Sequence, residues 1–257
     1  MGKAVHASQP PPSIDPALLL AAYRVGVFPM ADTREDPDIF WVEPRRRAIL
    51  PLDGFRCSRS LARTLRRGRF EVTCDAAFEQ VIDECAAPRP ETDETWISAR
   101  IRQAYCELHA LGHAHSIECW QNGRLVGGLY GVGFDRVFCG ESMFSRVPDA
   151  SKVALAWLVA ALRRAGVILL DCQFITSHLA SLGAVEITQE EYLKLLAEAQ
   201  ASGARGLAEG AGEGEAEGLG AAEAAGLPEG FGALLAAAER SSSSPGNFIA
   251  QSLTHTS

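Results

Sequence analysis

Two acids and one amide stand in short segments that alternate apolar and polar residues. Glu141 lies in VFCGESMF (137–144), and Asp171 and Gln173 lie in VILLDCQF (167–174). Because side chains alternate along a strand, Asp171 and Gln173 are predicted to share one face. Carboxylates attract ammonium groups and move protons, and an amide both donates and accepts hydrogen bonds. These three residues are therefore the candidates for catalysis.

The elements around these residues determine whether the side chains can meet. Residues 137–144 are predicted to form a strand, residues 150–162 a buried helix, and residues 167–173 another strand. A helix between two strands forms a crossover, so the two strands are predicted to be parallel. Ligands favour the carboxyl ends of strands in such sheets. The two acids and the amide are expected at those ends.

The residues between the first strand and the helix give two further expectations. Asp149 is predicted to cap the helix that begins at Ala150, whose N-terminus could hold an anion. Strict alternation along the strand places Met143 on the face of Glu141 and Phe144 on the opposite face. The candidate residues are thus expected near a helix N-terminus.

The composition indicates a chain that folds in a reducing compartment without crossing a membrane. Of 257 residues 47% are hydrophobic, yet no apolar run reaches the length of about eighteen that suggests a membrane span. The seven cysteines are spread singly without a C-x-x-C pair. His113 and His115 lack a nearby ligand set for a metal. We expect a cytoplasmic protein with no membrane partner and no metal.

The remaining chain alternates helical and extended patterns. Asp15 and Pro16 are typical of a helix start, and the QNGR sequence is typical of a hairpin turn. Helices are predicted at residues 16–23, 58–67, 76–86 and 99–111, and further strands at residues 114–120 and 125–132. A meander that leads into a crossover predicts a mixed α/β sheet, in the layout of the N-acyltransferase fold.

The chain divides by composition. The segment from Glu198 to Arg240 holds eight Glu and two Arg among many Ala and Gly residues, which favours disorder or a loose helix. The predicted division is a flexible leader (1–13), a small N-terminal domain (14–42), an N-acyltransferase-like catalytic domain (43–196) and a mostly disordered tail (197–257).

Several long strings carry a resemblance to a known family. AAYRVGVFPM, GRLVGGLYGV, VFCGESMFSRVPDASKVAL and LLDCQFITSHLASLGAVEI resemble the leucyl/phenylalanyl-tRNA–protein transferases, in that family's order and spacing. The resemblance covers about residues 14–196. One departure is Met30, because family members commonly have Trp at this position.

The resemblance implies a reaction and its participants. The family transfers Leu or Phe from aminoacyl-tRNA to the α-amine of proteins that begin with Arg or Lys, which creates a degradation signal and requires no ATP, metal or cofactor. Asp171 would then attract the acceptor ammonium and orient Gln173. Gln173 would contact the reacting centre, and Glu141 would complete this network or meet the basic side chain of the acceptor.

The resemblance also implies sites for the donated side chain and for tRNA. An apolar pocket and a contact to the terminal adenosine are expected from six residues: Leu129, Phe138, Leu158 and Leu170 for the pocket, and Trp96 and Tyr105 for the adenosine. Arg59, Arg63 and Arg67 recur every four residues and would form a basic stripe on a helix for acceptor-stem phosphates. An earlier run of three arginines, residues 45–47, is interpreted as part of a solvated loop.

Two other functions stay open. A coenzyme A-dependent N-acyltransferase would require backbone N–H groups for pyrophosphate, yet SRVPDASK (145–152) has no glycine and Pro148 has no N–H. A tRNA-binding protein without catalysis would require the basic stripe but would have no use for the pairing of Asp171 with Gln173.

Overall fold

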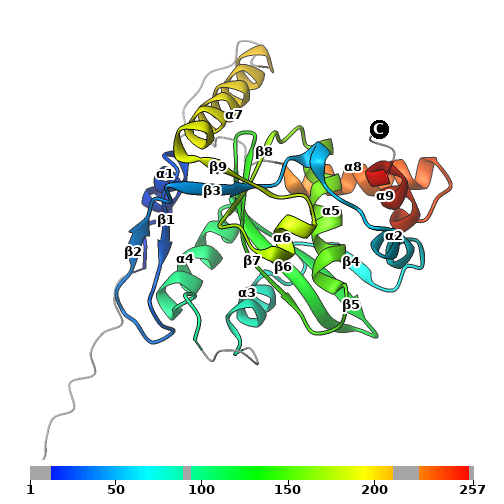
Figure 1. Ribbon diagram of the computed structural model, residues 1–257, viewed down its shortest axis with the longest axis horizontal. Helices are drawn as coiled ribbons and strands as arrows, with labels where there is room; N and C mark the ends of the chain where they lie inside the picture. Colours follow the sequence, from blue (N-terminus) through cyan, green and yellow to red (C-terminus); the bar gives the residue numbers. More distant parts are fainter. Residues whose placement is uncertain (1–12, 89–93, 211–225, 255–257) are drawn as a thin grey trace, which may run out of the picture.

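The computed structural model describes residues 13–88, 94–210 and 226–254, and Figure 1 shows how their elements are arranged. In this part of the chain, the main sheet has seven strands in the order β4-β5-β6-β7-β8-β3-β9. The strands are β3 (Arg46–Ile49), β4 (Glu71–Cys74), β5 (Ala114–Gln121), β6 (Arg124–Phe134), β7 (Val137–Ser145), β8 (Leu169–Gln173) and β9 (Val185–Thr188). The predicted mixed α/β sheet is confirmed.

Strands β4 to β7 form an antiparallel meander. Asn122 and Gly123 both have positive φ angles, 52° and 71°, in the turn between β5 and β6. This is the backbone conformation that the predicted two-residue hairpin turn requires, and Asn and Gly adopt it at low cost. The turn therefore fixes the pairing of β5 with β6.

The crossover is also confirmed. Helix α5 (Ala150–Arg164) connects β7 to β8, and these strands pair in parallel with Cys139 opposite Asp171. The expected cap is not formed: Asp149 adopts a left-handed conformation, φ 72°, and its side chain accepts no helix N–H. Its carboxylate instead accepts a hydrogen bond from Lys152 Nζ at 3.3 Å. An ion pair within the first turn has replaced the cap.

A β-bulge interrupts β7 at the residue predicted to be catalytic. Tyr130 of β6 pairs with Ser142 and Gly131 pairs with Gly140, so Glu141 is the extra residue. The bulge reverses the alternation beyond it. Met143 therefore packs with the apolar cluster on the α5 side of the sheet and Phe144 with the opposite cluster, so the predicted faces of these two residues are wrong.

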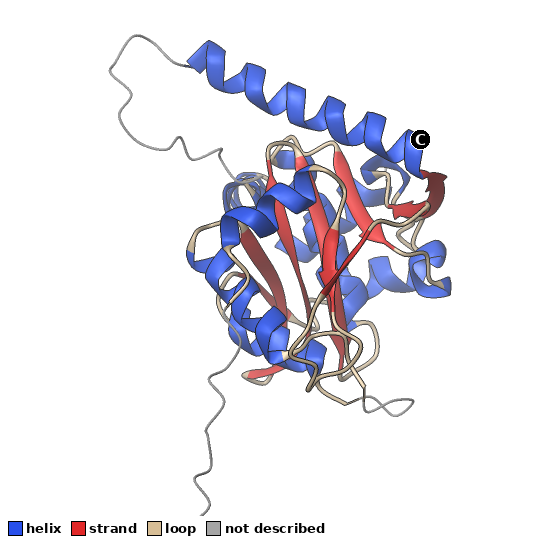
Figure 2. Ribbon diagram, turned by 90° about the vertical axis from the view of Figure 1, so that its left-hand side faces the viewer, coloured by secondary structure: helices blue, strands red, loops and turns tan. Residues whose placement is uncertain are grey.

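Helices cover both faces of the sheet (Figure 2). The face that α5 covers also carries η1 (Leu52–Gly54), α2 (Arg59–Arg66), α8 (Leu227–Arg240) and α9 (Pro245–Thr254). The other face carries α1 (Pro16–Arg24), α3 (Phe78–Ala86), α4 (Ala99–Ala110) and the start of α7 (Gln189–Gly210). A short helix, α6 (Ser177–Ser181), follows β8. None of the described helices is long and apolar enough to cross a membrane.

The N-terminal unit packs onto the sheet rather than standing apart. It consists of α1 and a hairpin of β1 (Phe28–Met30) and β2 (Phe40–Val42). Asp15 caps α1 as predicted, with its side chain accepting the N–H of Ala17. Leu19, Tyr23 and Phe28 are buried in the same apolar cluster as α3 and α4. Helix α1 therefore packs on the same face of the sheet as α3 and α4, where its side chains can reach the predicted catalytic residues.

The expectation of a mostly disordered tail is wrong for residues 227–254. Helices α8 and α9 pack on α5 and α2, and Leu227, Phe231 and Leu234 of α8 are buried. These residues recur at three- and four-residue intervals, which is the period of a helix face. Residues 211–225 lie outside the described part of the chain.

Candidate active site

A cavity of about 440 Å³ opens where β7 and β8 separate. The parallel pairing of the two strands ends at Cys139 and Asp171, so Glu141 and Gln173 lie just beyond the last pair. Six residues predicted for the site line this cavity: Glu141, Gln173, Trp96, Leu129, Leu158 and Leu170. The cavity thus lies at the carboxyl ends of the crossover strands, as ligand sites commonly do in such sheets.

Glu141 and Gln173 contact each other at the polar side of the cavity. Gln173 Nε2 donates a hydrogen bond to Glu141 Oε1 at 2.8 Å. Gln173 itself has a φ of 54°, a conformation that is strained for a residue other than glycine. Its backbone N–H donates to Asp171 Oδ1 at 2.9 Å, which stabilises this conformation. The two acids and the amide thus lie close together as expected, and the strained backbone belongs to the amide residue between them.

Asp171 lies behind this pair and has no exposed surface. Arg47 donates to both of its carboxylate oxygens, from Nε to Oδ1 at 2.9 Å and from Nη2 to Oδ2 at 2.5 Å. The hydroxyl of Tyr192 also donates to Oδ2, at 3.1 Å. Because an internal cation balances this carboxylate, the expected attraction of a substrate ammonium by Asp171 does not fit its position. Asp171 instead accepts the backbone N–H of Gln173, a contact that is compatible with the other expected task, orienting Gln173.

Arg47 is the main residue that the sequence interpretation missed. Its side chain is 1% exposed, although the run of three arginines suggested a solvated loop. The guanidinium lies over the rings of Phe28, at 4.9 Å, and Tyr192, at 4.4 Å. Arg45 and Arg46 fit the solvent-facing interpretation, because both are exposed and Arg46 forms an ion pair with Glu186. The alternation of side chains along β3 was the signal that could have separated Arg46 from Arg47.

Tyr105 does not lie where the sequence predicted. Its ring is fully buried, so the expected contact to a terminal adenosine is wrong for this position. Its hydroxyl donates to Glu141 Oε2 at 3.0 Å and is 2.5 Å from the hydroxyl of Tyr23 on α1. Tyr23 was also missed, because its place at the end of an apolar helix gave no sign of a polar role. The N-terminal unit thus reaches Glu141 through two phenols.

Burial raises the pKa of Glu141 from 4.5 to about 7, although the hydrogen bonds from the tyrosines lower it and partly offset the effect of burial. The nearby charges of Asp171 and Arg47 act in opposite directions on this pKa. A carboxyl group with such a pKa changes between its acid and base forms near neutral pH. Glu141 can therefore accept a proton from a bound substrate.

The apolar part of the cavity contains three of the four residues predicted for a side-chain pocket. Leu129, Leu158 and Leu170 line it, together with Met143 and Leu179. Phe138 does not line the cavity: it is fully buried in the core on the α5 side, so its assignment to the pocket is wrong. The bulge at Glu141 turns the strand after Phe138 and brings Met143 to the cavity instead.

The predicted basic stripe lies on another surface. Arg59, Arg63 and Arg67 are exposed on α2 and at its C-terminal cap, and no ion pair joins them to a residue in the described ranges. Figure 1 shows α2 beside α9, on the side of the molecule away from the N-terminal hairpin. Their charges are therefore available to an anionic partner.

Two family models match the chain. The model described as leucyl/phenylalanyl-tRNA protein transferase matches residues 49–197, and the model of that family's N-terminal domain matches residues 13–45. Leucyl/phenylalanyl-tRNA–protein transferase from Novosphingobium aromaticivorans is 69% identical, over 96% of this chain and 98% of that protein. The protein of the same name from Rhizorhabdus wittichii is 62% identical, over 72% of this chain and 74% of its own length.

Among solved structures, L-PGS from Bacillus licheniformis is similar at 14% identity, over 63% of this chain and 54% of that chain, with a TM-score of 0.37. The two family models and the identity to named relatives agree across both the N-terminal hairpin and the main sheet. The chain belongs to the leucyl/phenylalanyl-tRNA–protein transferase family.

Proposed function

We propose that the protein transfers Leu or Phe from aminoacyl-tRNA to the α-amine of proteins that begin with Arg or Lys, and so creates a degradation signal. One observation carries the proposal: a hydrogen-bonded Glu141–Gln173 pair stands at the polar side of a cavity whose other side is lined by leucines and a methionine. The apolar side suits a Leu or Phe side chain, and the polar side suits the ester and the amine. Family membership supplies the two substrates.

The reaction forms one amide bond and breaks one ester bond. The α-amine nitrogen attacks the ester carbonyl carbon, the bond from that carbon to the ribose oxygen breaks, and the ribose hydroxyl leaves with a proton. The attacking nitrogen loses one proton, which Glu141 accepts because its pKa is about 7. Since the ester is already activated, positioning and proton transfer are the tasks left to the protein.

Gln173 positions the attacking nitrogen. Its Nε2 is held by Glu141, so its amide oxygen is left as the acceptor for an N–H of the incoming amine. Asp171 and Arg47 hold the backbone of Gln173 from behind the cavity. In this arrangement Asp171 is a positioning residue that does not touch the substrate. Glu141 also supplies negative charge toward a basic first residue of the acceptor.

The donated side chain lies among Leu129, Leu158 and Leu170. A pocket that admits an unbranched β-carbon and excludes branched ones would accept Leu and Phe and reject Ile and Val. Donor choice is thus a matter of shape, for which discrimination of roughly ten- to two-hundred-fold is typical.

The experiment is a transfer assay with labelled Leu-tRNA and an Arg-starting peptide. We expect labelled peptide from Leu-tRNA and Phe-tRNA, much less from Ile-tRNA or Val-tRNA, and none from labelled acetyl-coenzyme A. An Ala-starting peptide of the same length is the control for the acceptor. Transfer of acetyl groups, or tRNA binding without any transfer, would contradict the proposal.

A further inference from the structure

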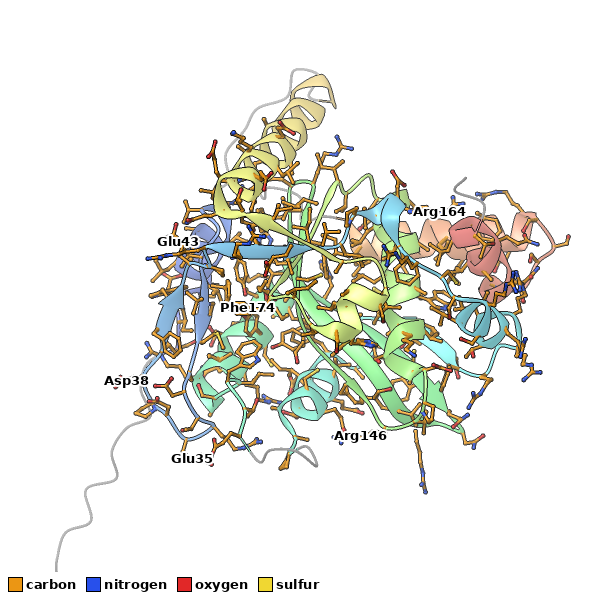
Figure 3. The ribbon with its side chains drawn as sticks, in the orientation of Figure 1. Glu35, Asp38, Glu43, Arg146, Arg164 and Phe174 are labelled. Atoms are coloured by element: carbon orange, nitrogen blue, oxygen red, sulfur yellow. The ribbon has the colours of Figure 1, made fainter. Side chains whose placement is uncertain are left out.

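The N-terminal unit supplies a buried phenol that the mechanism above does not use. Tyr23 of α1 is 1% exposed, and its hydroxyl lies 2.5 Å from the hydroxyl of Tyr105 on α4. The hydroxyl of Tyr105 in turn donates to Glu141 Oε2 at 3.0 Å. Figure 3 shows the N-terminal unit, where Asp38 and Glu43 are labelled, on the side of the molecule that also holds α4. Two hydroxyl groups therefore connect this unit to the proton acceptor.

The spacing of buried residues in two helices places these hydroxyls. Leu19 and Tyr23 lie four residues apart on α1 and are both buried, so they share the face that packs against α4. Tyr105 shares the buried face of α4 with Ile101 and Leu108. Each of the two rings is almost fully enclosed, so its hydroxyl can form hydrogen bonds only with groups inside the protein.

The number of protons fixes the direction of the two hydrogen bonds. A phenol hydroxyl has one proton to donate and can also accept a hydrogen bond. Burial raises the pKa of Tyr23 and of Tyr105 well above the ordinary range, so both hydroxyls keep their protons. Because Tyr105 gives its one proton to Glu141, Tyr23 must be the donor in the bond between the phenols. Both O–H groups then point toward the carboxylate, and each bond strengthens the other.

The two oxygens of Glu141 have separate partners. Gln173 donates to Oε1, so Oε2 is the oxygen that the phenols hold. Burial raises the pKa of Glu141 to about 7, and the hydrogen bonds of the phenols oppose this effect because they favour the ionised carboxylate. Further charged or titratable groups near Glu141 are Arg47 of β3, Tyr130 of β6, Cys139 of β7 and Asp171 of β8.

We propose that Tyr23 is a positioning residue for the transfer reaction: it orients the hydroxyl of Tyr105, which holds the carboxylate of Glu141 ready to accept the proton of the amine. This inference rests on the proposed function and gives the N-terminal unit a part in it. Tyr23 does not touch the substrate, and neither phenol transfers its own proton. Without the hydroxyl of Tyr23, the O–H of Tyr105 loses the partner that fixes its direction, and the ionised form of Glu141 is less favoured.

The first test is the pH dependence of leucine transfer by Tyr23→Phe, at saturating Leu-tRNA and Arg-starting peptide. This variant keeps the buried ring and removes only the hydroxyl. Transfer requires ionised Glu141, so we expect the acid side of the pH–rate profile to move up by roughly one pH unit. The rate should be about ten-fold lower at the acid end and unchanged at the alkaline end, with an unchanged KM for Leu-tRNA.

Tyr130→Phe is the matched control. Tyr130 is fully buried in the same apolar cluster, and its ring meets the ring of Tyr105 with centroids 5.4 Å apart. Its hydroxyl has no hydrogen-bond partner within the described ranges of the chain. The same substitution at this position should therefore leave the pH–rate profile where it is in wild type. A shift as large as that of Tyr23→Phe would show that the loss of any buried hydroxyl moves the profile, and would overturn the proposal.

A double-mutant cycle with Tyr105→Phe separates a relay from two independent contacts. Tyr105→Phe removes the link between Tyr23 and Glu141, so the addition of Tyr23→Phe should cause no further shift of the profile. If Tyr23→Phe shifts the profile equally with and without the hydroxyl of Tyr105, Tyr23 does not act through Tyr105 and the proposal is wrong.

The titration of Glu141 can also be measured without the reaction, by carbon-13 NMR of labelled glutamate carboxyl groups, with Glu141→Gln to identify its signal. We expect the midpoint to rise in Tyr23→Phe and to stay in place in Tyr130→Phe. An unmoved midpoint in Tyr23→Phe would overturn the proposal. A wild type that transfers no leucine, while the midpoint still rises in Tyr23→Phe, would instead contradict the proposed function and support the contact between the phenols and Glu141.

Discussion

Two groups of charges in this molecule are organised in opposite ways. At the reaction centre, Arg47 and Asp171 are buried and bonded to each other. On α2, Arg59, Arg63 and Arg67 are exposed and face solvent. A buried ion pair holds one geometry, and removing one partner leaves an uncompensated charge. Exposed charges act at longer range and are screened by salt. The buried pair is therefore suited to holding a fixed geometry, whereas the exposed arginines are suited to attracting an anionic partner.

The largest expected effect comes from breaking the buried pair. Asp171→Ala should lower kcat roughly a hundred- to ten-thousand-fold, because it frees the backbone of Gln173. It should also lower the free energy of unfolding by about 3–5 kcal/mol, because the Arg47 charge stays buried without a partner. Transfer at saturating Leu-tRNA and urea unfolding measure the two effects.

A matched control for this variant is Asp83→Ala, which breaks an exposed pair with Arg102. Its cost should be under about 1 kcal/mol, with turnover unchanged. A folded Asp171→Ala protein that binds tRNA and keeps near-normal turnover would remove Asp171 from the mechanism.

The next effect tests the exposed side of the comparison. Replacing Arg59, Arg63 and Arg67 together by Ala should weaken Leu-tRNA binding and lower the salt slope of log Kd by about 2–3, as for three lost phosphate contacts. At saturating Leu-tRNA, kcat should not change. Binding titrations across a range of salt concentrations measure this, with Arg124→Ala at the start of β6 as a control. Equal affinity and an equal slope would show that the stripe does not meet tRNA.

Two buried leucines distinguish a role in the pocket from a role in the core. Leu170→Ala should reduce the preference for Leu-tRNA over Val-tRNA by roughly ten-fold, because it widens the pocket that crowds branched side chains. Leu162→Ala is the control, since Leu162 is equally buried on α5 but does not line the cavity. Both should lose about 2–5 kcal/mol of stability. If their donor profiles match that of wild type, Leu170 serves only the core.

The smallest expected effect is on stability and depends on pH. The pKa of Glu141 is raised from 4.5 to about 7, so the folded protein binds this proton more tightly than the unfolded chain. Stability from this group is therefore greatest below its ordinary pKa and is lost as pH rises from 4.5 to 7. Glu141→Gln should be more stable than wild type by about 1–3 kcal/mol at alkaline pH, with the difference absent in acid. Urea unfolding at both pH values decides the matter, and an equal difference at both would contradict it.

Much of the fold could be predicted because local patterns agreed with it. The crossover followed from a strand, a buried helix and another strand, and it placed Glu141 near Gln173. Strict alternation failed beyond Glu141 because a bulge depends on pairing with β6, which a single strand does not record. Helix α8 was missed because its Ala- and Gly-rich composition outweighed the helical spacing of Leu227, Phe231 and Leu234.

The site was predictable where residues were close in sequence and hidden where they were distant. Asp171 and Gln173 lie two residues apart, so one strand related them. Arg47 and Tyr23 come from β3 and α1, and only tertiary packing brings them to Asp171 and Tyr105. Burial was also hidden in the sequence. A run of arginines is typical of an exposed segment, yet a buried guanidinium that donates to two acceptor oxygens fixes a geometry.

We expect the Glu141–Gln173 pair to carry the transfer. Its most direct test is the rate of leucine transfer to an Arg-starting peptide by Gln173→Ala at saturating Leu-tRNA, with folding and tRNA affinity measured on the same preparation. We expect this rate to fall by roughly a hundred- to ten-thousand-fold, with tRNA affinity unchanged. A folded Gln173→Ala protein that binds Leu-tRNA normally and transfers leucine at the wild-type rate would contradict it.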